Sequence, residues 1–504
     1  MRQLSKSKLI AFRQCPKRLW LEIHKPELRE DSVATQKSFQ VGHSVGEIAK
    51  RIYDPAKTGI EINAQRDGYQ EAFAQSAKLL ANPQQPIFEA GLQIDGALAF
   101  ADVMLPDPSG GVPGWRMVEV KSSTSVKDYH RDDIAIQSFI AQSEGIILKA
   151  VGLACIDSAW VYPGGDDYRG LLTETDLTAE AFARTGEVKD WIADAQKVAA
   201  RKSEPAIETG EHCHEPFDCG FCNYCNRDKP QPDFPLDWLP RLSATLRSRL
   251  TDQGIDDLRG VPDAELNEQQ IRVKQHTINN TVYFDAAGAA ADLAPHGFPA
   301  YFLDFETVQL AVPIWKGTRP YQQISFQFSL HKLASSGRLS HSGFIDLSGR
   351  DPSEQFARAL IAACGERGPV FVYNAAFETS RLRELAERYP KQANALLGML
   401  DRVVDLLPIA RNRYYHPAQK GSWSIKAVLP AAVPELSYEK LVGIQDGGMA
   451  MDAYCEAVQP STTAGRKAEI ERQLKAYCRL DTFAMVRLWQ FFNGRRESAL
   501  LDPP

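Results

Sequence analysis

The sequence predicts an α/β protein in which two sheet-containing domains are joined by a small helical domain. The chain has 504 residues, which exceeds one typical domain core. Short apolar runs typical of strands gather at residues 87–122 and 300–373, and helical patterns alternate with them. The proline-rich segment 229–235 between them has the composition of a linker. We therefore expect domains at 1–228, 229–293 and 294–504.

In the first domain, residues 1 to about 80 carry apolar residues at helical spacing. Strands are expected at 87–89, 91–94, 99–105 and 115–120, where turn residues separate the apolar runs. Residues 133–150 are expected to form a helix and 159–162 a strand.

The middle segment, residues 236–290, is expected to be helical. Within it, residues 250–259 place a glycine between two short amphipathic stretches, which fits either a helix-hairpin-helix or a plain helical spacer. The last domain begins with apolar runs at 300–305, 324–330 and 370–373, and the last of these leads into a helix. Alternating strands and helices predict a central sheet.

Composition gives no global sign of a nucleic-acid partner. With 58 Lys and Arg against 64 Asp and Glu, the net charge is −6, so positive charge would have to be concentrated locally. No run reaches the roughly 18 apolar residues of a membrane span, and the first residues lack the apolar stretch of a signal peptide. We expect a cytoplasmic protein with no membrane partner, whose nine cysteines are not disulfide-bonded.

The first candidate site combines Asp102 with Glu119 and Lys121. Strand alternation places Glu119 and Lys121 on one face and the neighbouring valines on the other. A hairpin would bring Asp102 beside them. Two carboxylates can hold Mg²⁺ or Mn²⁺, and a lysine can stabilise the negative charge that develops during hydrolysis. The alternative is that these three are ordinary exposed polar residues of strands.

The second candidate site begins with Asp304 and Glu306, which share a face of an apolar strand. Two buried like charges are costly without a cation. Downstream, Glu378 falls in the first turn of a helix. Near the end of the chain, Tyr477 and Asp481 lie at i and i+4 of another helix and share its face.

A cysteine group forms the third candidate site. Four cysteines fall within 13 residues, at Cys213, Cys219, Cys222 and Cys225, and Cys15 stands near the start of the chain. Thiolate ligation suits an iron–sulfur cluster or Zn²⁺. Local closure of the four late cysteines around Zn²⁺ is the alternative, and His212 and His214 are further possible ligands.

The Asp102, Glu119 and Lys121 spacing resembles the PD-(D/E)xK nuclease superfamily, which has a restriction-endonuclease-like fold. The run "VGHSVGEIAK", with His43 as an extra metal ligand, and Gln137 in "IAIQSFIAQ" resemble the RecB-type branch of that superfamily. This resemblance implies a metal-dependent nuclease in which Gln137 joins Lys121 at the catalytic site.

In RecB-type relatives one early and three late cysteines hold a [4Fe-4S] cluster. The resemblance therefore implies a cluster on Cys15, Cys213, Cys219 and Cys225, with Cys222 as the alternate ligand. The late spacing differs from that of the relatives, so Zn²⁺ stays open.

The order of Asp304, Glu306, Glu378, Tyr477 and Asp481 resembles the DEDD exonucleases of the ribonuclease H-like fold, in their tyrosine subclass. That resemblance implies two Mg²⁺ or Mn²⁺ ions held by the four carboxylates and a water oriented by Tyr477. Glu378 departs from the usual Asp of the second motif.

The segments 317–331 and 414–430 resemble a bacterial family without assigned function that joins these two kinds of domain. Residues expected to contact substrate phosphates are Asn374, Arg411, Arg413, His416, Lys420 and Lys426, and a solvated basic face is the alternative. Asp405 is expected to hold the metal ligands in position without binding the metal itself.

We therefore expect a metal-dependent bifunctional nuclease that hydrolyses DNA, as single strands or at ends, with a 3′→5′ exonuclease in the C-terminal domain. An RNA-processing exonuclease with a non-catalytic N-terminal domain, or an inactive nucleic-acid-binding module, are the alternatives. A helicase partner is suggested by analogy with the RecB-type relatives alone.

Overall fold

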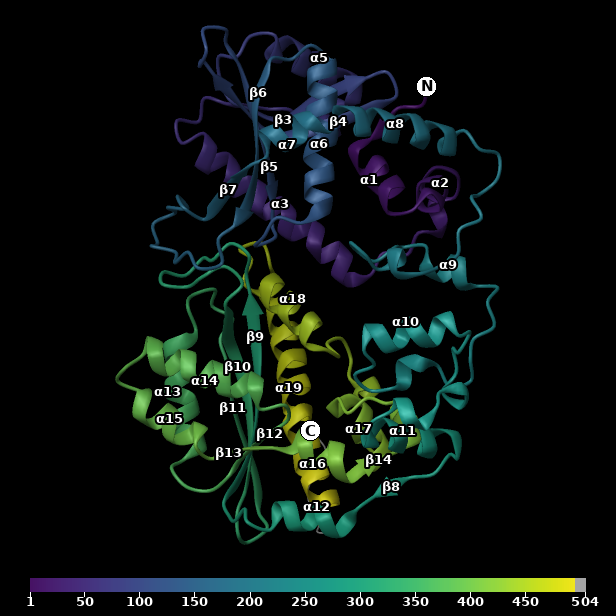
Figure 1. Cartoon of the computed structure of the whole chain (residues 1–504). Helices are drawn as coiled ribbons and strands as arrows, with labels where there is room; N and C mark the ends of the chain where they lie inside the picture. Colours follow the sequence, from purple (N-terminus) through teal and green to yellow (C-terminus); the bar gives the residue numbers. More distant parts are fainter. Residues whose placement is uncertain (495–504) are drawn as a thin grey trace. The chain divides into compact units, whose positions relative to one another are not determined.

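The computed structural model describes residues 1–494, and it divides by internal contacts into two compact units (Figure 1). Unit 1 comprises Met1–Lys229 together with Leu310–Gln322, and unit 2 comprises Pro230–Gln309 and the chain from Gln323 onward. The segment 230–293, expected to be a domain of its own, clusters with the C-terminal part in unit 2. Both units are α/β, in agreement with the predicted fold class.

Unit 1 is built on a seven-stranded sheet in the order β2-β3-β4-β5-β6-β7, with β1 paired to β4. The elements are β1 (Leu4–Ser5), α1 (Lys6–Gln14), α2 (Pro16–His24), α3 (Val33–Tyr53), β2 (Ile60–Glu61), α4 (Ala64–Asp67), α5 (Tyr69–Leu80), β3 (Ile87–Ile94), β4 (Ala97–Asp107), β5 (Gly114–Lys121), α6 (Asp128–Ser143), β6 (Leu148–Ile156), β7 (Leu172–Asp176), α7 (Thr178–Ala183), α8 (Thr185–Ala199) and α9 (Cys222–Asn226).

The predicted helices before residue 80 are confirmed, although this region also contains the short strands β1 and β2. The strands expected at 99–105 and 115–120 lie within β4 and β5, whereas those expected at 87–89 and 91–94 form the single strand β3. The expected strand at 159–162 is wrong, and the expected helix at 133–150 is too long. Helix α6 ends at Ser143, and Gly145 then adopts a positive φ of 90°, which glycine tolerates without a steric penalty. The apolar run that follows forms β6, parallel to β5. Burial on the sheet thus overrides the helical pattern.

Alternation along β5 places its polar and apolar residues on opposite faces of the sheet. Glu119 and Lys121 lie on the face covered by α6, because both side chains contact residues of that helix. Val118 is fully buried on the other face with Phe88 and Val103. The antiparallel pairing of β4 with β5 brings Asp102 to the same end of the sheet.

Unit 2 is built on a five-stranded sheet in the order β11-β10-β9-β12-β13. Its elements are α10 (Ala244–Asp252), α11 (Glu268–Ile278), β8 (Tyr283–Phe284), α12 (Ala286–Leu293), β9 (Ala300–Gln309), β10 (Gln323–Leu333), β11 (Leu339–Ile345), α13 (Ser353–Cys364), β12 (Val370–Val372), α14 (Ala376–Arg388), α15 (Ala393–Leu400), β13 (Val403–Asp405), α16 (Leu406–Arg413), β14 (Tyr414–Tyr415), α17 (Ile425–Ala432), α18 (Gly447–Ala457) and α19 (Ala464–Phe492).

Strands β9, β10 and β11 are antiparallel neighbours, whereas β12 and β13 run parallel to β9. Helices α13, α14 and α15 lie on one side of the sheet and α19 on the other (Figure 1). In the β9–β10 register Asp304 is opposite Ser329 and Glu306 is opposite Gln327. Side chains of directly opposed residues share a face, so all four point toward α19.

The helical part of unit 2 packs around its own apolar cluster, which includes Leu236, Leu250 and Leu258. Helix α10 ends at Asp252, and a short 3-10 turn at Leu258–Gly260 stands where a second helix was considered. The second amphipathic stretch is therefore a 3-10 turn and not an α-helix. No helix among residues 1–494 combines the length and apolarity needed to cross a membrane.

Candidate metal centres

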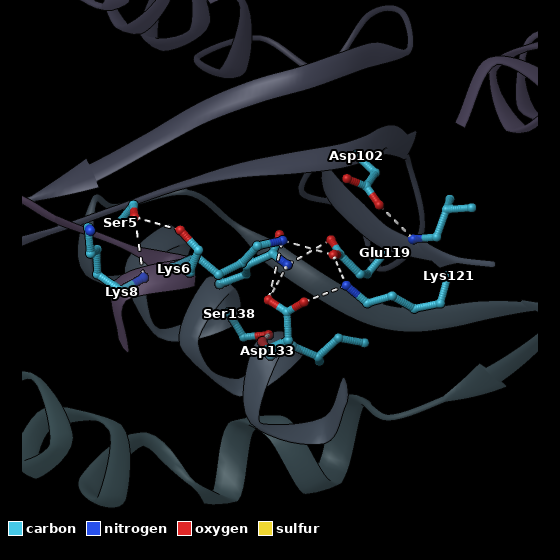
Figure 2. Close-up of polar contacts among 12 residues, drawn as sticks. Ser5, Lys6, Lys8, Asp102, Glu119, Lys121, Asp133 and Ser138 are labelled. Atoms are coloured by element: carbon cyan, nitrogen blue, oxygen red, sulfur yellow. Dashed lines mark hydrogen bonds and ion pairs between the residues drawn. The ribbon is translucent and has the colours of Figure 1, made fainter. Parts of the chain in front are cut away.

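In unit 1, Glu119 is the centre of a buried polar network at the end of β5 (Figure 2). Its Oε1 atom accepts from Lys121 Nζ at 2.6 Å and from Lys6 Nζ at 2.8 Å, and its Oε2 atom accepts from Gln137 Nε2 at 2.7 Å. The Glu119 side chain is 2% exposed. Two ammonium groups and an amide therefore hold this carboxylate in a fixed orientation.

Asp133 of α6 is a second acceptor for the same three side chains. Lys121 Nζ lies 2.5 Å from Asp133 Oδ2, Lys6 Nζ lies 3.2 Å from Oδ1, and Gln137 Nε2 lies 3.3 Å from Oδ1. Although burial opposes the shift, the carboxylates of Asp133 and Glu119 raise the pKa of Lys121 well above its usual value. Both lysines therefore stay charged.

Asp102 lies beside this network and receives the backbone N–H of Val120 at 2.7 Å. Burial and the charge of Glu119 raise the pKa of Asp102 to about 8. Glu89 stands at the register position opposite Asp102, between the pairs Phe88–Val103 and Ala90–Ala101, in a left-handed backbone conformation with φ of 55°. Burial and Glu119 also raise the pKa of Glu89.

The structure brings together Asp102, Glu119, Lys121 and Gln137, as the sequence suggested. It leaves His43 apart: this residue is exposed on α3 and takes part in no hydrogen bond, ion pair or ring contact among the residues described. Sequence reasoning missed Asp133, although its i, i+4 relation to Gln137 was a usable signal. It also missed Lys6, for which a position 113 residues before Glu119 offers no signal.

In unit 2, Asp304, Glu306 and Cys478 present ligand atoms within 4.8 Å of one another. The Cys478 thiol of α19 points at Asp304 Oδ2 at 3.5 Å. Burial, followed by the charges of Asp481 and Glu306, raises the pKa of Asp304 well above its usual value. Carboxylates that resist ionisation in this way favour either protons or a cation.

The charge of Asp481 on α19 acts on Asp304 and Glu306. The Tyr438 hydroxyl donates to Asp481 Oδ1 at 2.5 Å. Burial raises the pKa of Asp481 to about 6, against the opposing effect of hydrogen bonds from Tyr438 and Tyr477. Lys426 Nζ lies 5.3 Å from the centre of the Tyr477 ring and 5.5 Å from that of Tyr438, and its charge acts on Glu306 and Asp481.

Glu378 lies in the first turn of α14, where it is 2% exposed. Its Oε2 atom has no hydrogen-bond partner among the residues described, and burial raises its pKa to about 8. Asp405 supports the turn that carries it, because its carboxylate accepts from the backbone N–H groups of Asn374 at 2.9 Å and Ala375 at 3.0 Å.

A cavity of about 430 Å³ opens where β12 meets α14. Asn374, Arg411 and Arg241 line it together with the aromatic residues Tyr373 and Trp423. No acidic residue is part of its lining, and neither arginine forms an ion pair among the residues described. The cavity therefore joins positive charge to aromatic side chains.

Three other predicted substrate contacts have structural roles. Arg413 forms ion pairs with Asp285 at 2.7 Å and Asp292 at 2.8 Å, which link α16 to α12. His416 accepts the Ala418 N–H at 3.0 Å and caps a 3-10 turn. Lys420 lies over the Trp238 ring at 5.4 Å. Of the basic residues proposed, Arg411 lines the cavity, and Lys426 donates to the Gln445 carbonyl at 2.6 Å while its charge acts on Glu306 and Asp481.

All five candidate cysteines line one small cavity in unit 1. Cys15 stands between α1 and α2 and is buried, as is Cys213, and the other three are partly buried. Burial and the nearby Cys213 raise the pKa of Cys222 to about 12, so Cys222 lies within the group rather than apart. His212 also lines the cavity, whereas His214 does not and pairs with Asp218 at 2.8 Å.

Comparison with known proteins gives two matches. The model of a family described as "Domain of unknown function (DUF2779)" matches residues 301–424. An uncharacterized protein of Mycoplasma genitalium, MG366, is 25% identical over 212 residues. That alignment covers 38% of this chain and 32% of the relative, so it spans about a third of the relative's length. Residues 301–424 include Asp304, Glu306 and Glu378.

Proposed function

We propose that the protein is a metal-dependent nuclease with two active sites, one in each unit, that hydrolyses phosphodiester bonds of DNA. The observation that carries this proposal is the convergence of Asp304, Glu306 and Cys478, whose ligand atoms lie within 4.8 Å of one another, with the charge of Asp481 acting on Asp304. Such a cluster is costly without a divalent cation, and paired divalent ions are a common means of phosphodiester hydrolysis.

The topology of unit 2 supports a ribonuclease H-like exonuclease. Three antiparallel strands followed by two parallel ones, with the first acidic residues on the central β9 and the last on α19, give the arrangement that this assignment requires. Glu378 is 2% exposed, its Oε2 atom has no partner among the residues described, and its charge acts on Asp304.

In unit 1, the pairing of Asp102 with Glu119 and Lys121 supports a PD-(D/E)xK-type site. Gln137 and Lys6 would keep Glu119 oriented, and the Lys121 ammonium lies where negative charge would develop. This unit is proposed to act on single-stranded DNA or DNA ends.

At both sites a bound Mg²⁺ or Mn²⁺ would activate water and offset the negative charge that develops on the phosphate oxygens. In unit 2 the carboxylates of Asp304, Glu306, Glu378 and Asp481 would hold the ions. Burial and the charges of Asp481 and Glu306 raise the pKa of Tyr477. Its phenol therefore keeps its proton and can orient the attacking water.

The cavity at Arg411 and Arg241 supports a path for the substrate strand in unit 2. Unpaired guanidinium groups bind phosphates in bidentate fashion, and the adjoining aromatic residues can stack on bases. Arg241 comes from the helical segment that precedes β9, so this segment would form part of the nuclease rather than serve only as a linker.

The shared cavity of the five cysteines supports a [4Fe-4S] cluster, and Zn²⁺ is the alternative metal for the same thiolates. A cluster held by Cys15 and three late cysteines would fasten α1 and α2 to residues 213–225 and stabilise unit 1.

The nuclease proposal is tested with end-labelled single- and double-stranded DNA and RNA in Mg²⁺ or Mn²⁺. Wild type is compared with Asp102→Asn and Asp304→Asn, which keep the side-chain shape. Exposed Asp190→Asn in α8 and Asp401→Asn after α15 are matched controls. We expect each site variant to abolish a different activity, with loss of 3′→5′ degradation in Asp304→Asn. Equal activity of Asp304→Asn and wild type would contradict the proposed active site of unit 2. Cleavage of RNA but not of DNA would identify RNA as the substrate.

The cluster is tested by anaerobic purification. We expect brown protein with four irons, and loss of iron from Cys15→Ser. Comparing Cys222→Ser with Cys225→Ser identifies the spare thiol, because its loss leaves the iron in place. Colourless protein that contains zinc would contradict the iron–sulfur assignment.

A cytoplasmic location and a helicase partner complete the proposal as expectations from the sequence. A pull-down with anaerobically prepared protein, in the presence and absence of DNA, would test for the partner.

A further inference from the structure

A second cavity of unit 2, of about 400 Å³, lies between α19 and the strands β10 and β11. It is lined by Gln327, Ser329, His341, Lys475 and Arg479 among others, and its lining contains no acidic residue. Its volume falls in the range of small-molecule sites. Tyr477, Cys478 and Asp481 are absent from its lining, so this cavity is separate from the carboxylate cluster.

Arg479 is a cation without a counter-charge. It forms no ion pair among residues 1–494, and its Nε atom is buried without a hydrogen-bond partner. Burial and the Arg479 guanidinium lower the pKa of His341 to about 4, which places the guanidinium close to a neutral imidazole. A buried donor without an acceptor is costly, and an oxyanion is the partner that a guanidinium fits best.

The floor of the cavity also contains a polar atom that lacks a hydrogen-bond partner. Gln327 is 2% exposed, and its Nε2 atom donates to the Leu474 carbonyl at 2.9 Å. Its Oε1 atom is buried and has no partner among the residues described. Beside it, Ser329 Oγ lies 2.9 Å from His341 Nε2 and 2.7 Å from Thr482 Oγ1. The wall of the cavity therefore offers the cation Arg479, whereas the Gln327 carbonyl oxygen is enclosed beneath the floor.

We propose that this cavity binds the phosphate ester of a small molecule. Arg479 would hold the phosphate oxygens, with Lys475 at the rim, whose ammonium also pairs with Glu471 at 2.5 Å. Inorganic phosphate alone would fill only part of a cavity of about 400 Å³. The inference stands on the cavity itself and is independent of the proposed nuclease activity.

The position of the cavity also links it to the carboxylates. Gln327 and Ser329 are the β10 partners of Glu306 and Asp304, and Arg479 follows Cys478 on α19. A ligand held between β10 and α19 would therefore contact the two elements that position the carboxylate cluster.

Calorimetric titration of the full chain, without divalent metal, tests the proposal with ribose 5-phosphate, adenosine 5′-monophosphate and inorganic phosphate. We expect saturable binding of both esters, tighter than inorganic phosphate. An at least tenfold weaker affinity is expected in Arg479→Gln, with partial retention in Arg479→Lys. Exposed Arg472→Gln on the same helix is the matched control. Equal binding of the two esters identifies a sugar phosphate, and a preference for the nucleotide identifies the base as part of the ligand.

Three results would overturn the proposal. They are absence of saturable binding by the wild type, an equal loss in Arg472→Gln and Arg479→Gln, and equal competition by chloride at the same ionic strength. Arg479→Lys guards against misfolding as an explanation, since it keeps the charge on the same helical position.

Discussion

The two carboxylate sites balance their charge by different means. In unit 1, the ammonium groups of Lys6 and Lys121 lie within 3.2 Å of the Glu119 and Asp133 carboxylates. In unit 2, no lysine or arginine described forms an ion pair with the carboxylate cluster, which instead contacts the Tyr438 hydroxyl and the Cys478 thiol. The comparison teaches that the Glu119 and Asp133 carboxylates of the first site are paired with two lysines of the chain, whereas the carboxylates of the second site need protons or cations.

The largest expected effect breaks the balance in unit 1. Lys121→Met should destabilise this unit by about 3 kcal/mol, because removal of one partner leaves a buried carboxylate uncompensated. Denaturant unfolding without divalent metal, with hydrogen exchange of β5 and α6 peptides, measures the effect. Exposed Lys189→Met of α8 is the control and should change stability by less than about 0.5 kcal/mol. Equal effects of the two substitutions would contradict the charge-balance argument.

The second prediction concerns metal binding to unit 2. At a free Mn²⁺ concentration about 100-fold above its Kd, we expect stabilisation of about 2.7 kcal/mol at pH 8. Slower hydrogen exchange in β9 and α19 peptides would measure it.

The pH dependence of this effect follows from the raised pKa values. Burial raises the folded-state pKa of Glu378 to about 8 and that of Asp481 to about 6, from ordinary values of 4.5 and 3.8. At pH values between the ordinary and the raised pKa of each group, the folded state binds more protons than the unfolded state. The free energy of unfolding without metal therefore falls as pH rises. Mn²⁺ displaces these protons, and its stabilising effect should grow from pH 5.5 to pH 8. A larger effect at pH 5.5 would contradict this account.

The third prediction replaces one carboxylate of unit 2 with a neutral side chain of the same shape. Asp304→Asn should stabilise metal-free unit 2 by about 1–2 kcal/mol at pH 8, because one of several like charges is removed. At pH 5 the gain should be smaller, because burial and the neighbouring carboxylates raise the pKa of Asp304 and favour its protonated form in wild type. Thermal unfolding at both pH values measures it, and Asp401→Asn controls for the substitution itself. A destabilised Asp304→Asn at pH 8 would mean that the cluster is balanced without a cation.

The smallest expected effect concerns the Tyr438 hydroxyl. It donates to a carboxylate in unit 2, as the lysine ammonium groups do in unit 1. Tyr438→Phe removes the 2.5 Å hydrogen bond to Asp481 and should raise the pKa of that carboxyl by less than about one unit. The acidic limb of kcat/KM for 3′→5′ degradation should move to higher pH by the same amount. Tyr454→Phe is the control, because its buried hydroxyl has no partner among the residues described. An unchanged pH profile in Tyr438→Phe would assign the hydroxyl a packing role only.

Local periodicity predicted much of the fold and of both sites. Strand alternation placed Glu119 with Lys121 and Asp304 with Glu306, and helical spacing placed Tyr477 with Asp481, because these relations span two to four residues. The residues that were missed lie far away in sequence. Lys6 is 113 residues from Glu119 and Tyr438 is 43 residues from Asp481. Tertiary packing alone brings them together.

The strand β6 shows the same limit at the level of the fold. Its run of apolar residues is compatible with a buried helix or a buried strand, and periodicity alone does not separate the two. The parallel pairing with β5 decides the outcome. For His43, a helical position in a familiar motif did not bring the side chain to the carboxylates, since the exposure of one face of α3 depends on how that helix packs.

The discontinuity of unit 1 has a consequence for dissecting the protein. Because Leu310–Gln322 belongs to unit 1 while the strands on either side belong to unit 2, the chain changes unit three times. A fragment that starts at Pro230 would contain the thirteen residues 310–322 without the rest of unit 1. Ala311 and Trp315 are each less than 10% exposed in the intact chain, and in such a fragment they would be open to solvent. Neither unit is therefore a module that ends at residue 229, and separate expression of the two would need the excursion to be replaced by a short turn between β9 and β10.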